Sequence, residues 1–180
     1  MSIKARIEAF RRMSIVRQAL YVAVVVVAGV GVYTAVSYIQ EQPTRNFQAS
    51  PQGTVQLVNA DGGEYLSSIR VFDTPALRRE GLQKVRPEVA SEKPVLYVYR
   101  VSTTVRHSFS DVRVPLEIAF FDEDGVLNEI HSVAAGTASL RPAERYRFAL
   151  MAPPGYFAAN GIGVEVQTSL LPDSVAVASR

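Results

Sequence analysis

The sequence contains no cysteine and no tryptophan, and only two of its 180 residues are histidine. The absence of cysteine excludes disulfide bonds, thiolate nucleophiles and cysteine-ligated zinc sites. The sequence also lacks a glycine-rich phosphate loop and a serine–histidine–aspartate motif with its supporting residues. We therefore expect no catalytic residues, no metal site and no cofactor, and hence a protein that is not an enzyme.

Positive charge is concentrated at the start of the chain. Residues 1–17 carry five basic residues and one acid, a net charge of +4, whereas the rest of the chain carries 14 basic and 16 acidic residues, a net charge of −2. Nucleic-acid binding depends largely on the neutralisation of phosphates by basic side chains. A slightly acidic domain without a basic stripe therefore predicts no nucleic-acid partner.

Residues 18–39 (QALYVAVVVVAGVGVYTAVSYI) contain no charged side chain. At about 1.5 Å per residue this segment is roughly 33 Å long as a helix, which is enough to cross a hydrocarbon core of ~30 Å. It is predicted to be a transmembrane helix in the lipid bilayer. Because basic residues flank only its N-terminal side, we expect residues 1–17 in the cytoplasm and the remaining chain outside the inner (cytoplasmic) membrane, in the periplasm or its equivalent.

Alternatives remain for this N-terminal part. A cleaved signal peptide would use Ala35-x-Ser37 as its small-residue site, but the apolar run is too long for that class, which favours a retained anchor. Residues 1–17 form either an amphipathic helix on the membrane surface or a basic tail that only sets the topology. Within the helix, Ala28, Gly31 and Ala35 share one face, and their small side chains would allow close packing of another helix.

The chain beyond the helix is expected to hold a linker at residues 40–53, a β-rich domain at residues 54–170 and a C-terminal tail at residues 171–180. The linker is polar and contains two prolines. Alternating or apolar runs predict strands at residues 54–59, 65–72, 95–101, 116–121, 126–133, 146–151 and 163–167. Capping and proline signals predict short helices at residues 75–80 and 156–160. We expect an α+β fold, a mostly antiparallel sheet or small open β-barrel with two short helices, preceded by one transmembrane helix.

The strongest local signal is the hairpin around Asp124 and Gly125. An Asp-Gly pair between two strand-like runs is typical of a tight turn that needs a positive φ. The acids at residues 122–124 are interpreted as turn residues, because the rest of the twelve-residue calcium-binding loop pattern is missing.

The sequence resembles a known family in three stretches. Residues 115–133 (PLEIAFFDEDGVLNEIHSV) resemble the central hairpin of the bacterial and archaeal family called domain of unknown function 192. Residues 71–82 (VFDTPALRREGL) are similar to its strand, helix and Gly-Leu segment, and residues 142–162 (PAERYRFALMAPPGYFAANGI) to its closing strand, turn and helix. The resemblance implies a compact β-rich fold, often behind a secretion signal, and no established reaction.

Departures from the family pattern are concentrated in a few places. Gln83 replaces the methionine after Gly-Leu, and residues 94–97 (PVLY) replace a Gly-Met-Leu-Phe strand. Residues 108–112 (SFSDV) replace a Trp-Met-x-Asn-Thr run, and Glu117 replaces the aspartate after Pro-Leu. If the family binds something at these positions, the site is altered or lost here, which favours a scaffolding role.

Four polar residues are candidates for the rim of a ligand site or interface: His107, Asp111, Arg113 and Glu117. Their spacing matches no recognised metal or catalytic pattern, and the alternative is a set of polar residues on a loop. His131, on a predicted strand, is interpreted as a surface or half-buried histidine rather than a ligand.

Taken together, these features predict a single-pass, membrane-anchored accessory or structural subunit. Its helix and outer domain would bind a larger integral-membrane complex, for example a respiratory or photosynthetic one. The alternative is a periplasmic small-ligand or carbohydrate-binding domain tethered to the membrane.

Overall fold

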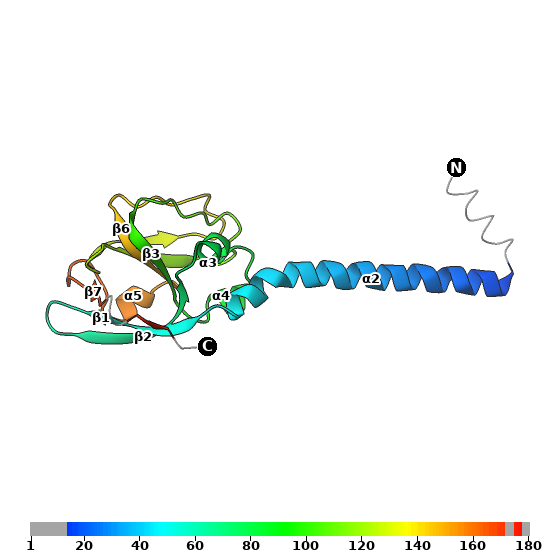
Figure 1. Ribbon diagram of the computed structural model, residues 1–180, viewed down its shortest axis with the longest axis horizontal. Helices are drawn as coiled ribbons and strands as arrows, with labels where there is room; N and C mark the ends of the chain where they lie inside the picture. Colours follow the sequence, from blue (N-terminus) through cyan, green and yellow to red (C-terminus); the bar gives the residue numbers. More distant parts are fainter. Residues whose placement is uncertain (1–13, 172–174, 178–180) are drawn as a thin grey trace. The chain divides into compact units, whose positions relative to one another are not determined.

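The structure, a computed structural model, describes residues 14–171 and 175–177 (Figure 1). The chain forms two compact units, Met1–Gln42 and Pro43–Arg180. The prediction for residues 1–17 falls almost entirely outside the described residues.

A long apolar helix, α2 (Ile15–Gln48), begins in the first unit. It is long and apolar enough to cross a membrane, and no residue of its most apolar stretch is buried in the protein. Ala28, Gly31 and Ala35 lie in this exposed part. The predicted long apolar helix near the N-terminus is therefore confirmed.

The helix does not end at residue 39, so the predicted linker at residues 40–53 is wrong over most of its length. Helix α2 runs through Pro43 to Gln48. Its last turns, from Pro43 onward, belong to the second unit, where Thr44 and Phe47 are buried. The ring of Phe47 packs edge-on against Phe72 at a centroid distance of 5.9 Å. The burial of Phe47 stabilises the helix in residues 43–48, a polar segment whose sequence shows no helical periodicity.

The second unit is built on one curved sheet (Figure 1). Its strands are β1 (Gln52–Val58), β2 (Glu64–Phe72), β3 (Val95–Thr103), β4 (Leu116–Phe121), β5 (Leu127–Val133), β6 (Tyr146–Ala152), β7 (Ser169–Leu170) and β8 (Ala176–Val177). The order is β5-β4-β6-β3-β2-β1-β7, and β8 also pairs with β1. A bridge between Val126 and Ser169 joins the two ends of this order. The predicted mostly antiparallel, barrel-like fold is confirmed as a half-barrel.

One neighbouring pair, β2 and β3, is parallel, while the other strand pairs are antiparallel. A parallel pair needs a crossover connection, and helices α3 (Pro75–Glu80) and α4 (Pro87–Ala90) lie in it. The predicted α3 is confirmed with its signals, since Thr74 Oγ1 accepts a hydrogen bond from the Leu77 N–H and Gly81 ends the helix. Helix α4, which starts with Pro87 after Arg86, was not predicted.

Alternation along the strands creates two hydrophobic cores, because successive side chains point to opposite faces of a sheet. From the strands, the first core receives Phe72, Val95, Tyr97, Ile118, Phe120, Ala149 and Met151. The second core receives Val71, Leu96, Ala119, Phe121, Phe148, Leu150 and Ala152. The end of α2, helix α4 and the loop at residues 104–115 contribute buried residues to the first core, whereas α5 (Tyr156–Ala159) contributes Phe157 to the second.

Two predictions for the C-terminal part are wrong. Residues 163–167 are a turn rather than a strand, with Gln167 at a φ of +49° and its N–H bonded to the Val164 carbonyl. The tail at residues 171–180 was expected to lie outside the fold, yet Ala176–Val177 forms β8 against the start of β1. Both short strands, β7 and β8, use the free edge of β1.

The hairpin prediction is confirmed. Gly125 has a φ of +85°, and the Asp122 carboxylate accepts hydrogen bonds from the backbone N–H groups of Asp124 (3.0 Å) and Val126 (2.8 Å). Asp122, the first residue of the acidic run, thus stabilises the turn by binding the backbone N–H groups of the turn itself.

Candidate ligand pocket

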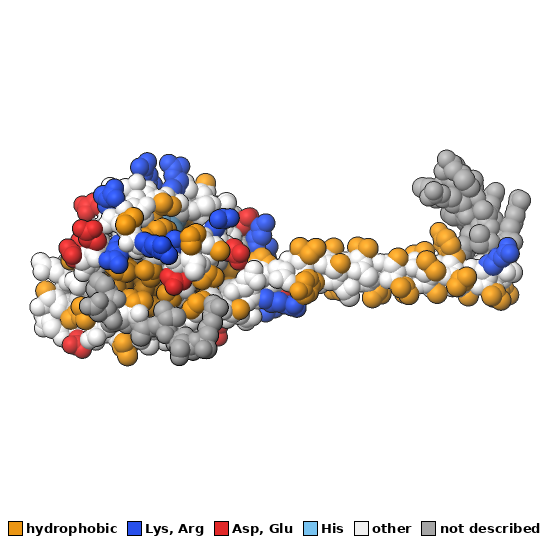
Figure 2. All heavy atoms as spheres, in the orientation of Figure 1, with side chains coloured by type: hydrophobic (Ala, Val, Ile, Leu, Met, Phe, Trp, Pro, Cys, Tyr) orange, Lys and Arg blue, Asp and Glu red, His pale blue; other side chains and the backbone are white. Residues whose placement is uncertain are grey.

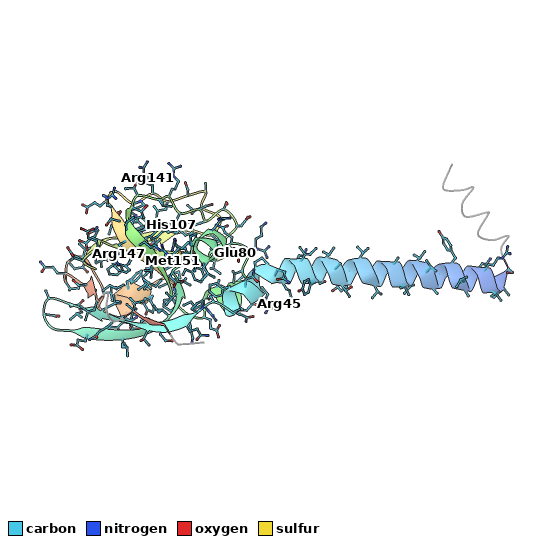
Figure 3. The ribbon with its side chains drawn as sticks, viewed as in Figure 1. Arg45, Glu80, His107, Arg141, Arg147 and Met151 are labelled. Atoms are coloured by element: carbon cyan, nitrogen blue, oxygen red, sulfur yellow. The ribbon has the colours of Figure 1, made fainter. Side chains whose placement is uncertain are left out.

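A cavity of about 270 Å³ opens on the first-core side of the sheet. It is lined by α3 and the turn after it, by β3, by the loop at residues 104–115 and by Met151 of β6. We call it the His107 pocket. Figure 3 shows His107 and Met151 inside the domain, with Arg141 at its periphery.

The floor of the pocket is apolar and aromatic. Leu82, Tyr97, Phe109, Val112 and Met151 line it, and all five are buried. The His107 ring meets the Tyr97 ring edge-on at 5.4 Å and stacks near Phe109 at 6.3 Å. Such a floor offers flat, rigid apolar surfaces to a bound molecule.

His107 is fixed by a hydrogen-bonded chain. Tyr146 Oη lies 2.8 Å from His107 Nε2 and donates its proton to the carbonyl oxygen of Val105 at 2.9 Å. His107 Nε2 must therefore be the donor to Tyr146, which leaves Nδ1 as an acceptor. Two backbone hydrogen bonds between His107 and Leu140 hold the same residue from behind.

The titratable groups of the floor are neutral at pH 7. Burial lowers the pKa of His107 to about 4. Burial also raises the pKa values of the tyrosine hydroxyls of Tyr97, Tyr99 and Tyr146 above their ordinary value. The floor therefore offers uncharged hydrogen-bonding groups at pH 7.

Stability is expected to fall as the pH drops from 6.5 toward 4. The folded-state pKa of His107 lies below the unfolded value of 6.5, so the unfolded chain takes up this proton first. The stabilisation is complete above pH 6.5 and about 2 kcal/mol of it is lost by about pH 4.5. Urea unfolding at a series of pH values should show this loss in the wild type and not in His107→Gln. Parallel stability curves for the two proteins would contradict the assignment.

The rim of the pocket is polar and basic. The Arg78 guanidinium lies over the Tyr99 ring at 4.8 Å and donates to the carbonyl oxygens of Asp73 and Val98, the latter at 2.7 Å. The Gln83 amide donates to the Ser108 carbonyl and accepts from the Asp111 N–H, so it ties the turn after α3 to the loop. Among the described residues that line the cavity, none is aspartate or glutamate.

The structure brings only one of the four predicted rim residues into the pocket, namely His107. Asp111 is exposed and pairs with Lys84, with 3.8 Å between Oδ2 and Nζ. Arg113 is exposed on the same loop and does not line the cavity.

Glu117 lies on the opposite face of the sheet from His107. It stands on β4 between Leu116 and Ile118, which belong to the first core, so its side chain points to the other face. Its Oε2 atom is buried and has no hydrogen-bond partner among the described residues. Glu117 and His107 therefore do not form a common site.

The lining residues that sequence reasoning missed are the arginines and tyrosines. Arg78, Arg79 and Arg106 surround the cavity, and Tyr97 and Tyr99 come from one face of β3. The spacing of Tyr97 and Tyr99 indicated that both lie on one face of their strand. Nothing in the sequence showed that this face lies beside the loop at residues 104–115.

The departures from the family pattern nonetheless pointed to this place. Gln83, Tyr97, Ser108, Phe109 and Val112, all within the departing segments, line the His107 pocket. Five of the departing positions therefore lie around one cavity, whereas Leu96 and Glu117 lie on the other face of the sheet.

His131 has a structural role, as interpreted from the sequence. It is half-buried on β5, with Nε2 in contact with the Glu129 carboxylate, whose other oxygen accepts the Ala143 N–H at 2.8 Å. Within residues 14–171 and 175–177, no group of three or more histidine, aspartate or glutamate side chains is arranged to hold a metal ion.

The fold and the pocket define a class: a small β half-barrel domain with an aromatic pocket, preceded by a long apolar helix. The chain belongs to the DUF192 family of uncharacterised proteins (Uncharacterized ACR), whose sequence profile matches residues 57–170. No curated protein matches the chain.

Two solved structures share the fold. One is a protein from Sinorhizobium meliloti whose description proposes a transcription regulator; it is 22% identical, with a TM-score of 0.59 over 68% of this chain and 95% of that one. The other is a protein of unknown function from Novosphingobium aromaticivorans; it is 18% identical, with a TM-score of 0.57 over 69% of this chain and 94% of that one. At these identities the similarity establishes the fold alone.

Proposed function

We propose that the protein is a membrane-tethered binding protein whose folded unit holds a small molecule in the His107 pocket. The observation that carries this proposal is a cavity of about 270 Å³ with a buried aromatic floor and a few polar groups at its rim. Small-molecule sites have this combination, and a cavity of about 150 Å³ already accepts benzene. The ligand would thus be somewhat larger than a single aromatic ring.

Binding is better supported than catalysis. The His107 imidazole is engaged with Tyr146, and burial keeps it neutral at pH 7. The lining hydroxyls of Tyr97 and Tyr99 have raised pKa values, which makes them poor nucleophiles. These groups can orient a ligand by donating and accepting hydrogen bonds.

A pair of tryptophan variants tests the proposal. Ser108 lines the pocket, whereas Ser110 is exposed on the same loop and does not line it; their hydroxyls are hydrogen-bonded to each other at 3.2 Å. Both Ser108→Trp and Ser110→Trp lose that bond, but only the first places an indole at the mouth of the cavity. Thermal unfolding of the full chain in detergent, screened with small aromatic compounds, should reveal stabilising ligands for the wild type and Ser110→Trp.

Ser108→Trp should lose this stabilisation without a matching fall in its own melting temperature. Ligands that stabilise Ser108→Trp as much as the wild type would place their site elsewhere and overturn the proposal.

The tether gives this binding unit a location, which we propose to be the outer side of the cytoplasmic membrane. The charge asymmetry around α2 supports a cytoplasmic N-terminus. Because the chain lacks cysteine, a single cysteine introduced at exposed Ala135 would be the sole thiol. A membrane-impermeant maleimide added to intact cells should label Ala135→Cys and leave Ser14→Cys unlabelled. The reverse pattern would invert the topology.

A second candidate is an accessory subunit of a larger membrane complex. The exposed apolar surface of α2, including the face of Ala28, Gly31 and Ala35, favours it, since such a face allows close contact with another helix. Native sizing after gentle detergent extraction would separate the two candidates. A solitary monomer under all conditions would exclude the accessory role and leave ligand binding.

A further inference from the structure

We infer that the His107 pocket takes a small organic anion, a carboxylate or phosphate attached to an apolar body, and that Arg79 and Arg106 bind its charge. This inference rests on the proposed binding function and names the chemistry of the ligand. The surface in Figure 2 shows basic side chains in blue beside an apolar area in orange on one face of the domain.

The charge of the pocket is of one sign. Three arginines, Arg78, Arg79 and Arg106, line it, and no aspartate or glutamate is found among its described lining residues. The acids closest in sequence are used elsewhere: Glu80 accepts a hydrogen bond from Asn46 at 3.2 Å, and Asp111 pairs with Lys84. An anion entering the cavity would therefore meet cationic groups and no competing carboxylate of the lining.

The three arginines differ in their present contacts. Arg78 is held in place by two backbone carbonyl oxygens and by the Tyr99 ring. Arg79 and Arg106 are exposed, and neither guanidinium makes a hydrogen bond or ion pair with any residue in the described ranges. Their donors are thus available for a ligand, and a guanidinium matches a carboxylate or phosphate in geometry.

The floor determines the other half of the ligand. It is aromatic and apolar, and its polar atoms, on His107, Tyr97 and Tyr99, are hydroxyl or imidazole groups. Such a floor accommodates an uncharged ring or alkyl body whose charged end remains at the basic rim. This distribution favours an organic anion over a neutral carbohydrate and disfavours a cation.

Benzoate and benzamide are suitable probes, because they have nearly the same shape and differ in charge. The full chain, reconstituted in phosphatidylcholine nanodiscs, would be titrated calorimetrically with each compound and with inorganic phosphate. We expect benzoate to bind roughly tenfold more tightly than benzamide. In the variant that combines Arg79→Gln and Arg106→Gln, benzoate affinity should fall to about that of benzamide, a roughly tenfold loss.

Arg100→Gln is the matched control. Arg100 is exposed on β3 directly after Tyr99 and does not line the cavity. Its benzoate affinity should stay within about twofold of the wild type. An equal loss in Arg100→Gln would reduce the effect to general surface charge and overturn the inference.

The remaining outcomes separate the two proposals. Equal binding of benzoate and benzamide would overturn the anion inference while leaving small-molecule binding in place. Failure of benzoate, benzamide and phosphate to bind at all would count against both. Nanodiscs containing phosphatidylglycerol distinguish the sources of the anion: unchanged benzoate affinity indicates a soluble ligand, and several-fold weaker binding indicates that a lipid headgroup competes for the pocket.

Discussion

Replacing Arg70 with methionine is expected to lower the free energy of unfolding by about 2 kcal/mol. Arg70 stands on β2 with only 4% of its surface exposed, and its Nη1 donates to the carbonyl oxygens of Phe47 (3.2 Å) and Gln48 (3.0 Å). These carbonyls end α2 and have no partner within the helix. The guanidinium also lies over the Phe47 ring at 4.8 Å.

The sign of this effect depends on two opposing terms. Burial lowers the pKa of Arg70, which means that desolvation of its charge costs free energy, and the partly exposed Glu92 at 3.8 Å offsets only part of that cost. Methionine removes the charge and keeps much of the apolar stem. It leaves the Gln48 carbonyl oxygen without its donor, however, at a cost of about 1–3 kcal/mol, whereas the Phe47 carbonyl oxygen still accepts hydrogen bonds from the Ser50 N–H and the Ser50 hydroxyl. The loss of the donors is expected to exceed the gain.

Urea unfolding of the full chain in detergent, followed by circular dichroism, measures this difference. Arg86→Met is the control, since Arg86 forms an exposed pair with Glu88 at 3.4 Å whose loss should cost below about 1 kcal/mol. Arg70→Lys should fall between the wild type and Arg70→Met, because an ammonium keeps a charged donor but lacks the planar guanidinium that bonds both carbonyls through Nη1 and lies over the Phe47 ring. If Arg70→Met loses no more stability than Arg86→Met, the end of α2 is held by Phe47 packing alone.

The second large effect is expected for Gly81→Ala, with a loss of about 4 kcal/mol in the free energy of unfolding. Gly81 has a φ of +54° and a ψ of −137°, a conformation open essentially to glycine. A Cβ atom at this position would lie 2.5 Å from the Tyr97 hydroxyl oxygen. Tyr97 is buried in the first core, so its ring would have to shift toward the His107 pocket to relieve this contact.

Two further variants divide this effect into its backbone and steric parts. Gly136 has a φ of +75°, and a Cβ atom added there would meet no other atom within 4 Å, so Gly136→Ala reports the backbone part alone, about 1 kcal/mol. Tyr97→Phe removes the clashing oxygen, after which the nearest atom is at 3.6 Å. Combined with Gly81→Ala, it should restore about 2 kcal/mol relative to the sum of the single changes. If the losses in unfolding free energy of Gly81→Ala and Tyr97→Phe simply added, the Tyr97 hydroxyl would not be the source of the steric cost.

Local signals in the sequence were sufficient for much of the fold. The Asp124-Gly125 turn and the Thr74 cap of α3 depend on residues within a few positions of each other, and both were predicted correctly. Helix at residues 40–48 depends instead on Phe47 meeting Phe72 and Arg70, which are distant in sequence. Helix propensity, which depends on neighbouring residues alone, cannot predict a contact between residues so far apart in the sequence.

The pocket was less predictable than the fold for the same reason. Its floor brings together Tyr97, His107 and Met151 from three separate segments. A strand between His107 and Glu117 was expected to separate their side chains, but the apolar run on β4 contains no polar alternation that would tell which face of the sheet Glu117 occupies. What the sequence did indicate was a set of unusual positions, and only the fold placed Gln83, Ser108 and Val112 around one cavity.

The burial of the last turns of α2 also sets where the domain can be separated from the apolar part of this helix. Thr44 Oγ1 accepts the Arg86 N–H at 3.1 Å, and Phe47 fills part of the first core. A protease that cut between Phe47 and β1 would remove pieces of the folded unit and leave a damaged domain. Cleavage near Ala35 and Ser37 would instead release residues from Pro43 onward complete. A form released by cleavage therefore keeps the complete folded unit only if the cut falls before Pro43.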